Sequence, residues 1–487
     1  MNIWFRVVTG RRACSTIFAL STGKGPSAIA IIRISGPKSR YVLTKMTNCK
    51  NPLDRQLYPT GIRHPVSNDM LDRGMAVWLK GPATFTGEDS CELHVHGSSA
   101  VIKDVCAALH EMDGLTPAAP GEFTKRAFLN GKMDLTMVEG LKNLLHAETS
   151  VQRKLALRVA SGSLNNLISQ WREVLVKSVA HLEACINFAE EDRKIDSGIL
   201  ERVRIQVLGL YNDIAKHLKD SHLSERVQEG VRIALLGKPN VGKSSLLNAI
   251  IQRDAAIVSP IPGTTRDSIA VGLDIHGQAA VITDTAGIRE TEEIVEVEGV
   301  KRSVQISQNA HILLLVVDAK ECKTSDLLRQ DVSELLSVVP GLHEQLARGK
   351  MDAVVVRNKC DLLHKGDLFC SDIVSLDNIQ QNIRMIDTSC LSGTGLDNLK
   401  GYLREIIDSV HERFDDHSTT ALLNQRHRRT LAVVLEDLSR CLQDLDNDVV
   451  LAAHRLGTAI RNIAQVTGLI TTEDVLDEVF SEFCIGK

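Results

Sequence analysis

The sequence predicts a chain of α/β and all-α regions. We expect a mixed α/β domain, a helical domain in two separate parts, and an α/β domain with a mostly parallel sheet inserted between those parts. Proline is one guide, because eight of the 12 prolines lie between Pro26 and Pro120 and none lies from Gly121 to Lys238. The other is hydrophobic periodicity, which changes from short apolar runs to helical spacing and back. At roughly 100–200 residues per domain, a chain of 487 residues corresponds to two to four domains.

The first predicted domain covers residues 17–125. Apolar runs such as Ala28–Ile34 and Met75–Leu79 alternate there with Gly, Pro and Asn, which is typical of strands joined by turns. We therefore expect a small mixed α/β domain in this section.

The helical domain is predicted from two segments, 126–228 and 409–487. Apolar residues recur in both mostly three or four positions apart, which indicates buried stripes on long helices. We expect the two segments to pack together. The apolar positions are Leu155, Leu157, Val159, Leu164, Leu167, Ile168, Trp171, Val174 and Leu175 in the first segment, and Leu431, Val434, Leu435, Leu438, Leu442 and Leu445 in the second.

The section between them, residues 229–408, contains four short and strongly apolar runs separated by helix-like stretches. Such an alternation predicts an α/β domain whose strands are mostly parallel. The four runs are Arg232–Leu236, Ala279–Thr283, Ile312–Val317 and Ala353–Val356.

The composition excludes several classes of protein. No run approaches the ~18 apolar residues of a membrane span. The net charge of −4 argues against a broad nucleic-acid-binding surface, so any such contact must be local. Aromatic residues make up only 3%, which disfavours a stacking platform for single strands. The 11 cysteines include no CxxC, so neither a zinc knuckle nor a disulfide framework is predicted, and a reducing compartment fits.

The N-terminal segment has a distinct charge pattern. The first acidic residue is Asp54, and Met1–Thr22 carries Arg6, Arg11 and Arg12 among apolar and hydroxyl residues. This pattern favours a mitochondrial transit peptide, here expected over residues 1–16, with a frayed basic terminus as the alternative.

A phosphate-binding loop follows the first apolar run of the third section. Gly237-Lys238-Pro239-Asn240-Val241-Gly242-Lys243-Ser244 matches GxxxxGKS between a strand and a helix. The glycines allow backbone N–H groups to turn toward phosphates at a helix N-terminus. We expect Lys243 to reach the β- and γ-phosphates and Ser244 to ligate Mg²⁺.

Four further motifs identify the domain as a Ras-like GTPase, and the last two of them concern the guanine base. Gly263–Asp267 supplies Thr265 for a second Mg²⁺ contact, and Asp284-Thr285-Ala286-Gly287 supplies a carboxylate for a metal-bound water and an N–H for the γ-phosphate. The Asp361 carboxylate of Asn358-Lys359-Cys360-Asp361 can accept from both the ring N–H and the amino group of guanine, whereas adenine would leave it unpaired. Ser389-Cys390-Leu391 stands where the last guanine loop is expected.

Ile288 occupies the position at which Ras-type enzymes place a water-orienting glutamine. Hydrolysis must therefore be organised by another group. The candidates are a cation and the downstream acids, most of which we expect to be a solvated face. These acids are Glu290, Glu292, Glu293, Glu296 and Glu298.

Motifs outside the GTPase section identify a family. The chain resembles the MnmE (TrmE) family of tRNA-modification GTPases, in its mitochondrial form, from about residue 17 to residue 487. The motifs that carry the resemblance are Ile32-Arg33-Ile34-Ser35-Gly36, Thr86-Gly87-Glu88-Asp89, Pro120–Lys132 (PGEFTKRAFLNGK) and Phe483-Cys484-Ile485-Gly486-Lys487.

The resemblance implies a three-part design and a set of partners. The N-terminal domain would dimerise and bind a one-carbon tetrahydrofolate, such as 5-formyl- or methylene-tetrahydrofolate. With an FAD-dependent MnmG-family partner, in a heterotetramer-like complex, such proteins install a 5-methyl-type substituent on wobble uridines of tRNA, taurinomethyl in animal mitochondria. The folate contacts implied by motif match are Arg33, Glu92, Lys132 and Lys487.

The resemblance also implies a potassium-activated GTPase whose G domains pair transiently, in the mitochondrial matrix. Glu296 matches the acid that orients the catalytic water, and Asp284 and Lys243 complete the catalytic set. The implied K⁺ site is Asn240, Ser259, Ile261 and Thr264. The implied GTP site is Asn240, Val241, Gly242, Lys243, Ser244, Ser245, Ser259, Thr264, Thr265, Asp284, Thr285, Ala286, Gly287, Asn358, Lys359, Asp361, Ser389, Cys390 and Leu391.

Some alternatives remain open at this level. A GTPase switch for ribosome assembly is the second functional hypothesis, although no KH-like module or basic tail follows the G domain; a polymerising scaffold has less support. Cys484 is either catalytic or a buried structural thiol. His94 and His96 have the spacing of a metal pair, but packing on a strand is the interpretation that we favour. The family's HGG is here His96-Gly97-Ser98, which we expect to alter a loop near the folate site.

Overall fold

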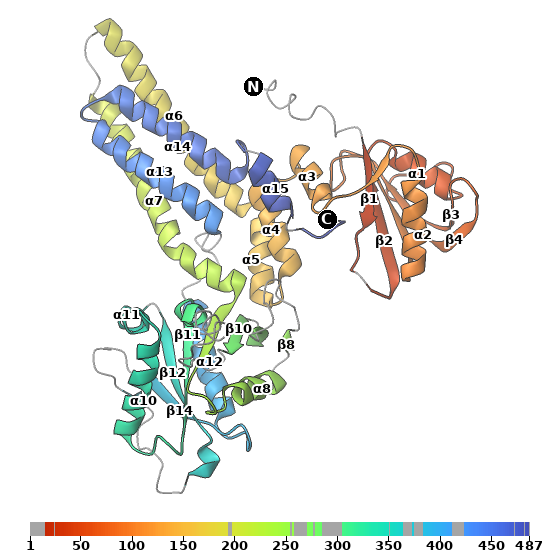
Figure 1. The fold of residues 1–487 in the computed structure, drawn as a ribbon. Coiled ribbons are helices and arrows are strands. Elements are labelled where there is room, and N and C mark those ends of the chain that lie inside the picture. The colour runs from red at the N-terminus through yellow and green to blue at the C-terminus, as the bar shows by residue number, and fades with distance from the viewer. Residues whose placement is uncertain are drawn as a thin grey trace, which may run out of the picture. The chain divides into compact units, whose positions relative to one another are not determined.

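The computed structural model describes most of the chain. The described residues are 15–23, 25–192, 197–253, 256–257, 270–275, 278–284, 304–349, 351–363, 373–374, 383–411, 423–471, 473–481 and 483–486. The chain divides into two compact units (Figure 1). One contains Met1–Lys142, Val159–Val203 and Arg440–Lys487, and the other contains Asn143–Arg158 and Arg204–Ser439.

A mixed sheet forms the N-terminal part of the first unit. Its described strands have the order β3-β4-β5-β2-β1-β6, antiparallel except for the parallel pair β1 and β6. Helices α1 (Ser39–Met46) and α2 (Ser99–His110) cover one face, where their apolar residues join those of the strands in one core. The strands are β1 (Thr16–Leu20), β2 (Ser27–Ser35), β3 (Leu57–Arg63), β4 (Met70–Leu79), β5 (Ser90–Gly97) and β6 (Leu115–Pro117).

On the opposite face of this sheet, the apolar side chains are buried near β1 and exposed toward β3. Near β1, Ile17 and Phe123 form a small buried cluster with Phe85 packed against it. Strand alternation places Arg33 and Glu92 on this face, because their neighbours belong to the core under α1 and α2. Farther along, toward β3, the apolar side chains on this face are exposed; they are Ile29, Leu57, Met70 and Met75.

Helices from both predicted helical segments come together in the first unit. Helix α14 (Val449–Thr467) packs along α6 (Ser163–Asp192), as Figure 1 shows. Helix α15 (Glu473–Ser481) packs on α3 (Glu122–Leu129), and Phe480 lies 6.3 Å from Phe128 between ring centroids. The predicted packing of the two helical segments is thereby confirmed. The other described helices of the two predicted helical segments are α4 (Leu135–His146), α5 (Ser150–Ala160), α7 (Ser197–Glu229) and α13 (Gln425–Asp444).

The last residues of the chain reach the N-terminal sheet. A Cβ built on Gly486 would lie 2.0 Å from the carbonyl oxygen of Leu20, so only glycine fits against the end of β1. The Ser21 hydroxyl donates to the Gly486 carbonyl at 3.0 Å. The C-terminal motif is therefore held beside the N-terminal sheet, and Cys484 within it is exposed, so the buried-thiol interpretation is wrong.

The second unit contains a larger sheet with the described strand order β13-β14-β12-β11-β7-β10-β9-β8. The strands from β10 to β14 through β7, β11 and β12 are parallel, and the edge pairs are antiparallel. All four predicted strands are present. The strands are β7 (Val231–Leu236), β8 (Ala256–Ile257), β9 (Ala270–Ile275), β10 (Gln278–Asp284), β11 (Ile312–Asp318), β12 (Asp352–Asn358), β13 (Ile373–Val374) and β14 (Ile383–Asp387).

Helices cover both faces of this sheet, which explains why its strands are continuously apolar. One core packs α8 (Lys243–Arg253) and α12 (Leu396–His411) on the sheet, and the other packs α10 (Ser325–Val338) and α11 (Leu342–Ala347) on it. Buried on both sides, the parallel strands open only at their carboxyl ends, where loops can meet a ligand. Across the described part of the chain, no helix is long and apolar enough to cross a membrane.

Candidate functional site

The phosphate-binding loop joins β7 to α8, as the sequence predicts. A Cβ on Gly237 would lie 2.3 Å from the Val316 carbonyl oxygen, and one on Gly242 would lie 2.4 Å from Nδ2 of Asn358. Gly242 has a φ of 96°, and Asn240 takes the left-handed conformation with a φ of 65°. The loop is therefore wrapped tightly between β11 and the Asn358 side chain. Its backbone N–H groups lie at the N-terminus of α8, an arrangement suited to anions.

Lys243 lies inside this loop and is 8% exposed. Its Nζ donates to the carbonyls of Gly237 at 2.8 Å and Lys238 at 3.0 Å. Burial lowers the pKa of the Lys243 ammonium below its ordinary value, and the nearby Asp284 carboxylate partly opposes that shift. The ammonium is thus aimed along the loop, where a phosphate would offer it a full negative charge in place of two carbonyl dipoles.

Ser244 and Asp284 meet at the carboxyl end of β10. The Ser244 hydroxyl donates to Oδ2 of Asp284 at 2.6 Å. The other carboxylate oxygen, Oδ1, is buried and accepts no hydrogen bond from any residue that the structure describes. A hydroxyl and a carboxylate are the hard oxygen ligands that Mg²⁺ prefers, and a buried carboxylate oxygen of this kind is suited to a metal-bound water. The residues therefore fit a magnesium ion.

The two base-recognition loops approach the phosphate-binding loop from β12 and β14. Asn358 is 2% exposed and its Nδ2 donates to the Val241 carbonyl at 3.0 Å. Lys359 donates to the Asn240 carbonyl and to Asp318, both at 2.7 Å. These contacts hold the phosphate-binding and base-recognition loops at the same edge of the sheet.

The Asp361 carboxylate, in the loop after β12, lies beside the loop that follows β14. The Ser389 hydroxyl donates to Oδ1 of Asp361, and the Cys390 thiol lies 3.4 Å from Oδ1 of Asn358. Burial raises the pKa of the Cys390 thiol, so it remains protonated near neutral pH. Leu391 is 90% exposed and has no packing role, which leaves it accessible to a ligand.

The described members of the predicted nucleotide site therefore lie along the carboxyl edge of one sheet, with Ser245 exposed on α8. Other predicted residues lie outside the described part of the chain. They are Ser259, Ile261, Thr264, Thr265, Thr285, Ala286, Gly287 and Glu296, together with Lys487 of the predicted folate site.

The predicted folate residues Arg33 and Glu92 are partners on β2 and β5. The Nε of Arg33 donates to Oε1 of Glu92 at 3.0 Å, and the guanidinium lies 5.7 Å from the Phe85 ring centroid and 6.0 Å from that of Phe123. Lys132 is exposed beside the loop that contains Gly87. The structure thus brings Arg33 and Glu92 together, beside an aromatic pair that the sequence analysis did not single out.

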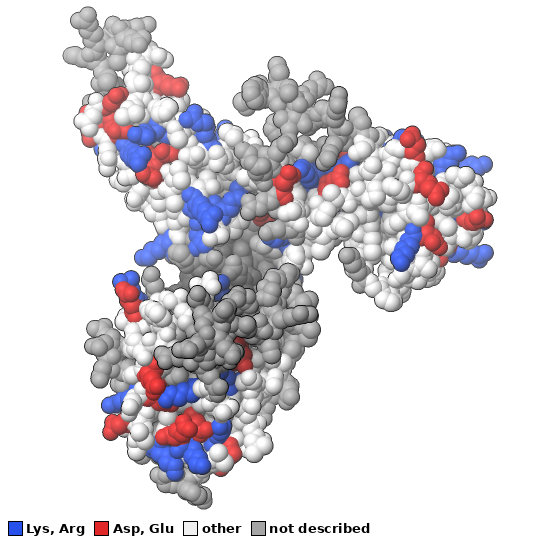
Figure 2. Space-filling view, in the orientation of Figure 1, with Lys and Arg blue, Asp and Glu red and all other residues white. Residues whose placement is uncertain are grey.

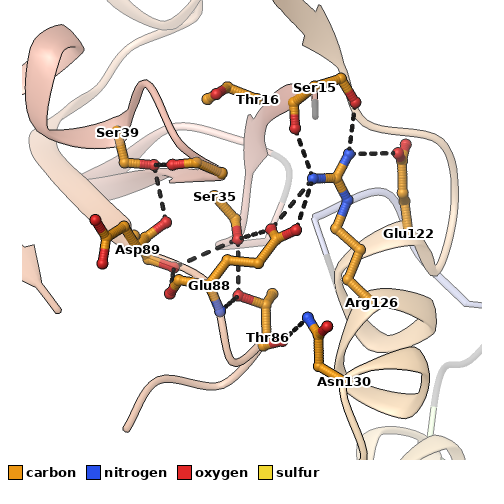
Figure 3. A network of polar contacts seen from close by, with 12 residues as sticks. Ser15, Thr16, Ser35, Ser39, Thr86, Glu88, Asp89, Glu122, Arg126 and Asn130 are labelled. Carbon is orange, nitrogen blue, oxygen red and sulfur yellow. Dashed lines mark hydrogen bonds and ion pairs between the residues drawn. The ribbon is translucent and has the colours of Figure 1, made fainter. Parts of the chain in front are cut away.

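A buried polar network, absent from the predicted site, connects the N-terminal motifs (Figure 3). Arg126 is 7% exposed; its guanidinium donates to both carboxylate oxygens of Glu88 at 3.2 and 3.1 Å, and to Oε1 of Glu122 at 3.1 Å. The Ser35 hydroxyl donates to Glu88 at 2.7 Å, and the Asn130 amide donates to the Thr86 carbonyl at 2.7 Å. Motif residues in this network pair with each other, so their role is to hold the 84–89 loop on α3.

His94 and His96 do not form a metal pair. His94 lies 3.4 Å from Glu92, and the His96 ring Nδ1 donates to the Asp72 carboxylate on β4 at 2.8 Å. No group of three metal-ligating side chains occurs in the described ranges. Ser98, the departure from HGG, accepts a hydrogen bond from the Val101 N–H at 3.2 Å and caps α2. The altered motif therefore serves the start of a helix.

Comparison with known proteins decides the family. Residues 135–484 match the MnmE helical domain, and residues 16–132 match the N-terminal domain of the GTP-binding protein TrmE. The chain belongs to the MnmE family of tRNA modification GTPases. It is 40% identical to the mitochondrial 5-taurinomethyluridine-[tRNA] synthase subunit GTPB3 of Danio rerio, over 97% of this chain and 93% of that protein.

Bacterial and mitochondrial MnmE-family proteins are equally similar to this chain. The tRNA modification GTPase MnmE of Orientia tsutsugamushi is 40% identical, over 97% of this chain and 99% of that protein. The mitochondrial subunit of Rattus norvegicus is 40% identical over 97% of this chain and 93% of its own length. Membership of the MnmE family makes this chain a GTP-binding GTPase and favours tRNA modification over ribosome assembly.

Proposed function

We propose that this MnmE-family GTPase is the GTP-hydrolysing subunit of a complex that modifies the wobble uridine of mitochondrial tRNAs. The product would carry a 5-methyl-type substituent, taurinomethyl or carboxymethylaminomethyl, built from a tetrahydrofolate one-carbon unit. The observation that carries the proposal is the single sheet edge on which Lys243, Ser244, Asp284 and Asp361 converge.

The chain's own residues explain how GTP would be bound and prepared for hydrolysis. Lys243 would exchange its hydrogen bonds to two backbone carbonyls for hydrogen bonds to the β- and γ-phosphates. Asp361 would accept hydrogen bonds from guanine. Ser244 and Thr265 would hold Mg²⁺, which when bound neutralises charge on the phosphates; Asp284 would orient one of its waters.

A monovalent cation is the proposed substitute for an arginine finger. Asn240 already adopts the left-handed conformation within the loop, and Ser259, Ile261 and Thr264 would complete a K⁺ site when two G domains pair. Glu296 would orient the attacking water, because Ile288 cannot. The test compares the rate of GTP hydrolysis in K⁺ with the rate in Na⁺, for the wild-type chain and for Glu296→Gln. We expect K⁺ to accelerate the wild-type chain and the variant to be slow in both salts.

The proposed folate site is built on Arg33 and Glu92, with Lys132 and Lys487. A carboxylate suits the pterin amide edge, and cationic side chains suit the glutamate tail. A pocket of about 640 Å³ lies on the same face of the sheet, lined in part by His94, Met75 and Arg73. The extreme C-terminus is anchored beside β1 by Gly486, which supports a contribution from the next residue.

A second copy of the chain and an MnmG-family protein are the proposed partners. Ile29 and Leu57 on the open sheet face are 60% and 45% exposed, and Met70 and Met75 are 42% and 45% exposed. Apolar side chains gathered on one uncovered face favour homodimerisation there. On the face that Figure 2 shows, basic and acidic side chains are interspersed over the described residues. We expect the partner to supply most tRNA contacts.

Mitochondrial location is proposed from the arginine-bearing, acid-free first segment. Fusion of residues 1–22 to a fluorescent protein tests it: import supports the proposal, and diffuse fluorescence contradicts it.

The experiment that tests the function is disruption of the gene followed by nucleoside mass spectrometry of mitochondrial tRNA. We expect loss of the 5-substituted wobble uridine, restored by the wild-type chain but not by Asp284→Ala. Unchanged nucleosides together with accumulated ribosomal precursors would instead support the assembly hypothesis.

A further inference from the structure

An ion pair between a buried arginine and a partly exposed aspartate joins two strands of the G-domain sheet immediately before the base-recognition loops. Arg357 on β12 is 0% exposed, and its Nε and Nη2 donate to Oδ1 and Oδ2 of Asp387 at 2.6 Å each. Asp387 is the last residue of β14. Two parallel N–H···O bonds fix the relative orientation of the partners as well as their separation.

The pair lies on the last rung of the sheet before the loops diverge. Arg357 and Asp387 are directly opposite each other in the parallel register of β12 and β14. One residue later, the Thr388 N–H donates to the Arg357 carbonyl at 2.9 Å, and the Cys360 N–H then donates to the Thr388 carbonyl at 3.0 Å. Any shift between the two strands is therefore passed directly to both loops.

Those loops contact each other through the residues expected to surround guanine. The Ser389 hydroxyl donates to Asp361, and the Thr388 hydroxyl and the Cys390 thiol both lie 3.4 Å from Oδ1 of Asn358. The position of the Asp361 carboxylate thus depends on where β14 places the 388–390 segment.

The surroundings argue that this pair is not there for stability. Alternation along β12 and β14 puts Arg357 on the face whose neighbours, Val355 and Met385, belong to the apolar core under α10 and α11. The Arg357 guanidinium loses all contact with water there, whereas the Asp387 side chain keeps 28% exposure. Desolvation of the guanidinium offsets much of the attraction between the two charges, and well-packed apolar residues commonly serve as well at such a position. What an apolar pair cannot supply is the angular constraint of the fork.

We propose that Arg357 and Asp387 are positioning residues that set guanine specificity by fixing the Asp361 and Ser389 loops relative to each other. This inference rests on the proposed GTP site. It assigns to the pair the geometry needed for Asp361 to accept two hydrogen bonds from the base, one from the ring N–H and one from the amino group.

Inosine nucleotides lack the amino group of guanine and offer Asp361 only the ring N–H. The ratio of GDP affinity to IDP affinity therefore reports on the second hydrogen bond, apart from any general loss of nucleotide affinity. The variants are Arg357→Lys, which keeps the charge without the fork, and the apolar double variant Arg357→Met/Asp387→Leu. In the full chain, we expect GDP affinity to fall about 10-fold and the GDP/IDP affinity ratio to fall about 5-fold, with ADP binding unchanged. Thermal unfolding of the double variant verifies that the fold is retained.

A matched control exists at the other end of the same strand. Arg384 of β14 pairs with Glu405 of α12 at 3.4 Å, three residues before Asp387. Glu405→Gln removes an ion pair to β14 and should leave the GDP/IDP ratio at its wild-type value.

Asp361→Asn distinguishes failure of this inference from failure of the proposed GTP site. An amide there can donate to the second carbonyl of xanthine, so preference should move from GDP to XDP. If Asp361→Asn leaves GDP binding unchanged, the GTP site itself is wrong. If it changes the preference while a folded Arg357→Met/Asp387→Leu chain keeps the wild-type GDP/IDP ratio, the positioning role is overturned.

Discussion

The nucleotide site and the N-terminal sheet face differ in how the sequence encodes them. The described part of the nucleotide site is built from short contiguous motifs at the carboxyl ends of β7, β10, β12 and β14. The N-terminal face instead combines side chains far apart in sequence, such as Arg33 and Glu92, which only the register of β2 and β5 brings together. The same region contains contiguous motifs whose residues, Glu88 and Arg126, bind each other. Contiguity in sequence therefore predicts well which residues lie together in the loops of the G domain, and poorly which residues lie together on a sheet face.

The largest expected effect is on the N-terminal network. Arg126→Met leaves the Glu88 carboxylate buried without its cation, which should cost about 3–5 kcal/mol in the free energy of unfolding. Thermal unfolding should show an early transition of the N-terminal domain while GDP binding persists. The neighbouring Lys125, partly exposed and paired with the exposed Asp477 at 2.7 Å, provides the control, because Lys125→Met should cost less than about 1 kcal/mol. Equal losses in the two variants would mean that the network has no structural role.

The next largest effect concerns Lys243 in the nucleotide site. Lys243→Ala should lower the rate of GTP hydrolysis about 100- to 1000-fold, because charge on the transferred phosphoryl group loses its buried cation. Single-turnover measurements separate this loss from weaker binding. Stability should not fall, since the variant removes an ammonium whose burial already lowers its pKa. A rate within a few-fold of the wild type would remove Lys243 from the catalytic set.

A smaller effect is expected at the other lysine of the phosphate-binding loop. Lys238, also in the phosphate-binding loop, turns away from it and pairs with Asp331 at 2.5 Å and Glu334 at 2.9 Å on α10. Its side chain is 38% exposed, so Lys238→Met should cost less than about 1 kcal/mol of stability. Hydrolysis measured beside Lys243→Ala should remain near wild type. A loss as large as that of Lys243→Ala would show that motif membership alone, and not side-chain direction, identifies the catalytic residue.

The smallest effect is a pH dependence in the N-terminal sheet. Burial would raise the pKa of Asp72, but hydrogen bonds from the His96 backbone N–H and ring outweigh burial and hold the pKa below the ordinary value of an aspartate. A carboxyl with a lowered folded-state pKa stabilises the fold above its unfolded pKa, and that contribution disappears as pH falls through the folded pKa. Asp72→Asn should therefore flatten the acid side of the stability profile in denaturant titrations. An unchanged profile would show that the pair adds nothing.

Much of the fold was accessible from the sequence because its signals are local. The four apolar runs of the G domain became β7, β10, β11 and β12, since strands buried on both faces must be apolar throughout. The interdependence of the base-recognition loops was not accessible. Nothing in the spacing of Arg357 and Asp387, 30 residues apart, indicates that they meet in the register of β12 and β14.

The sequence by itself determined the family, the order of the motifs and the identity of the base, because each of these depends on residue type within a few neighbouring positions. Tertiary structure alone decided which side chains the motif residues pair with and how exposed they are. Arg126 and Arg33 are both arginines in family motifs, yet Arg126 is buried and paired with Glu88 and Glu122, whereas Arg33 is partly exposed and paired with Glu92 beside Phe85. The reason is physical: a side chain's partners are set by strand register and packing, which sequence proximity does not encode.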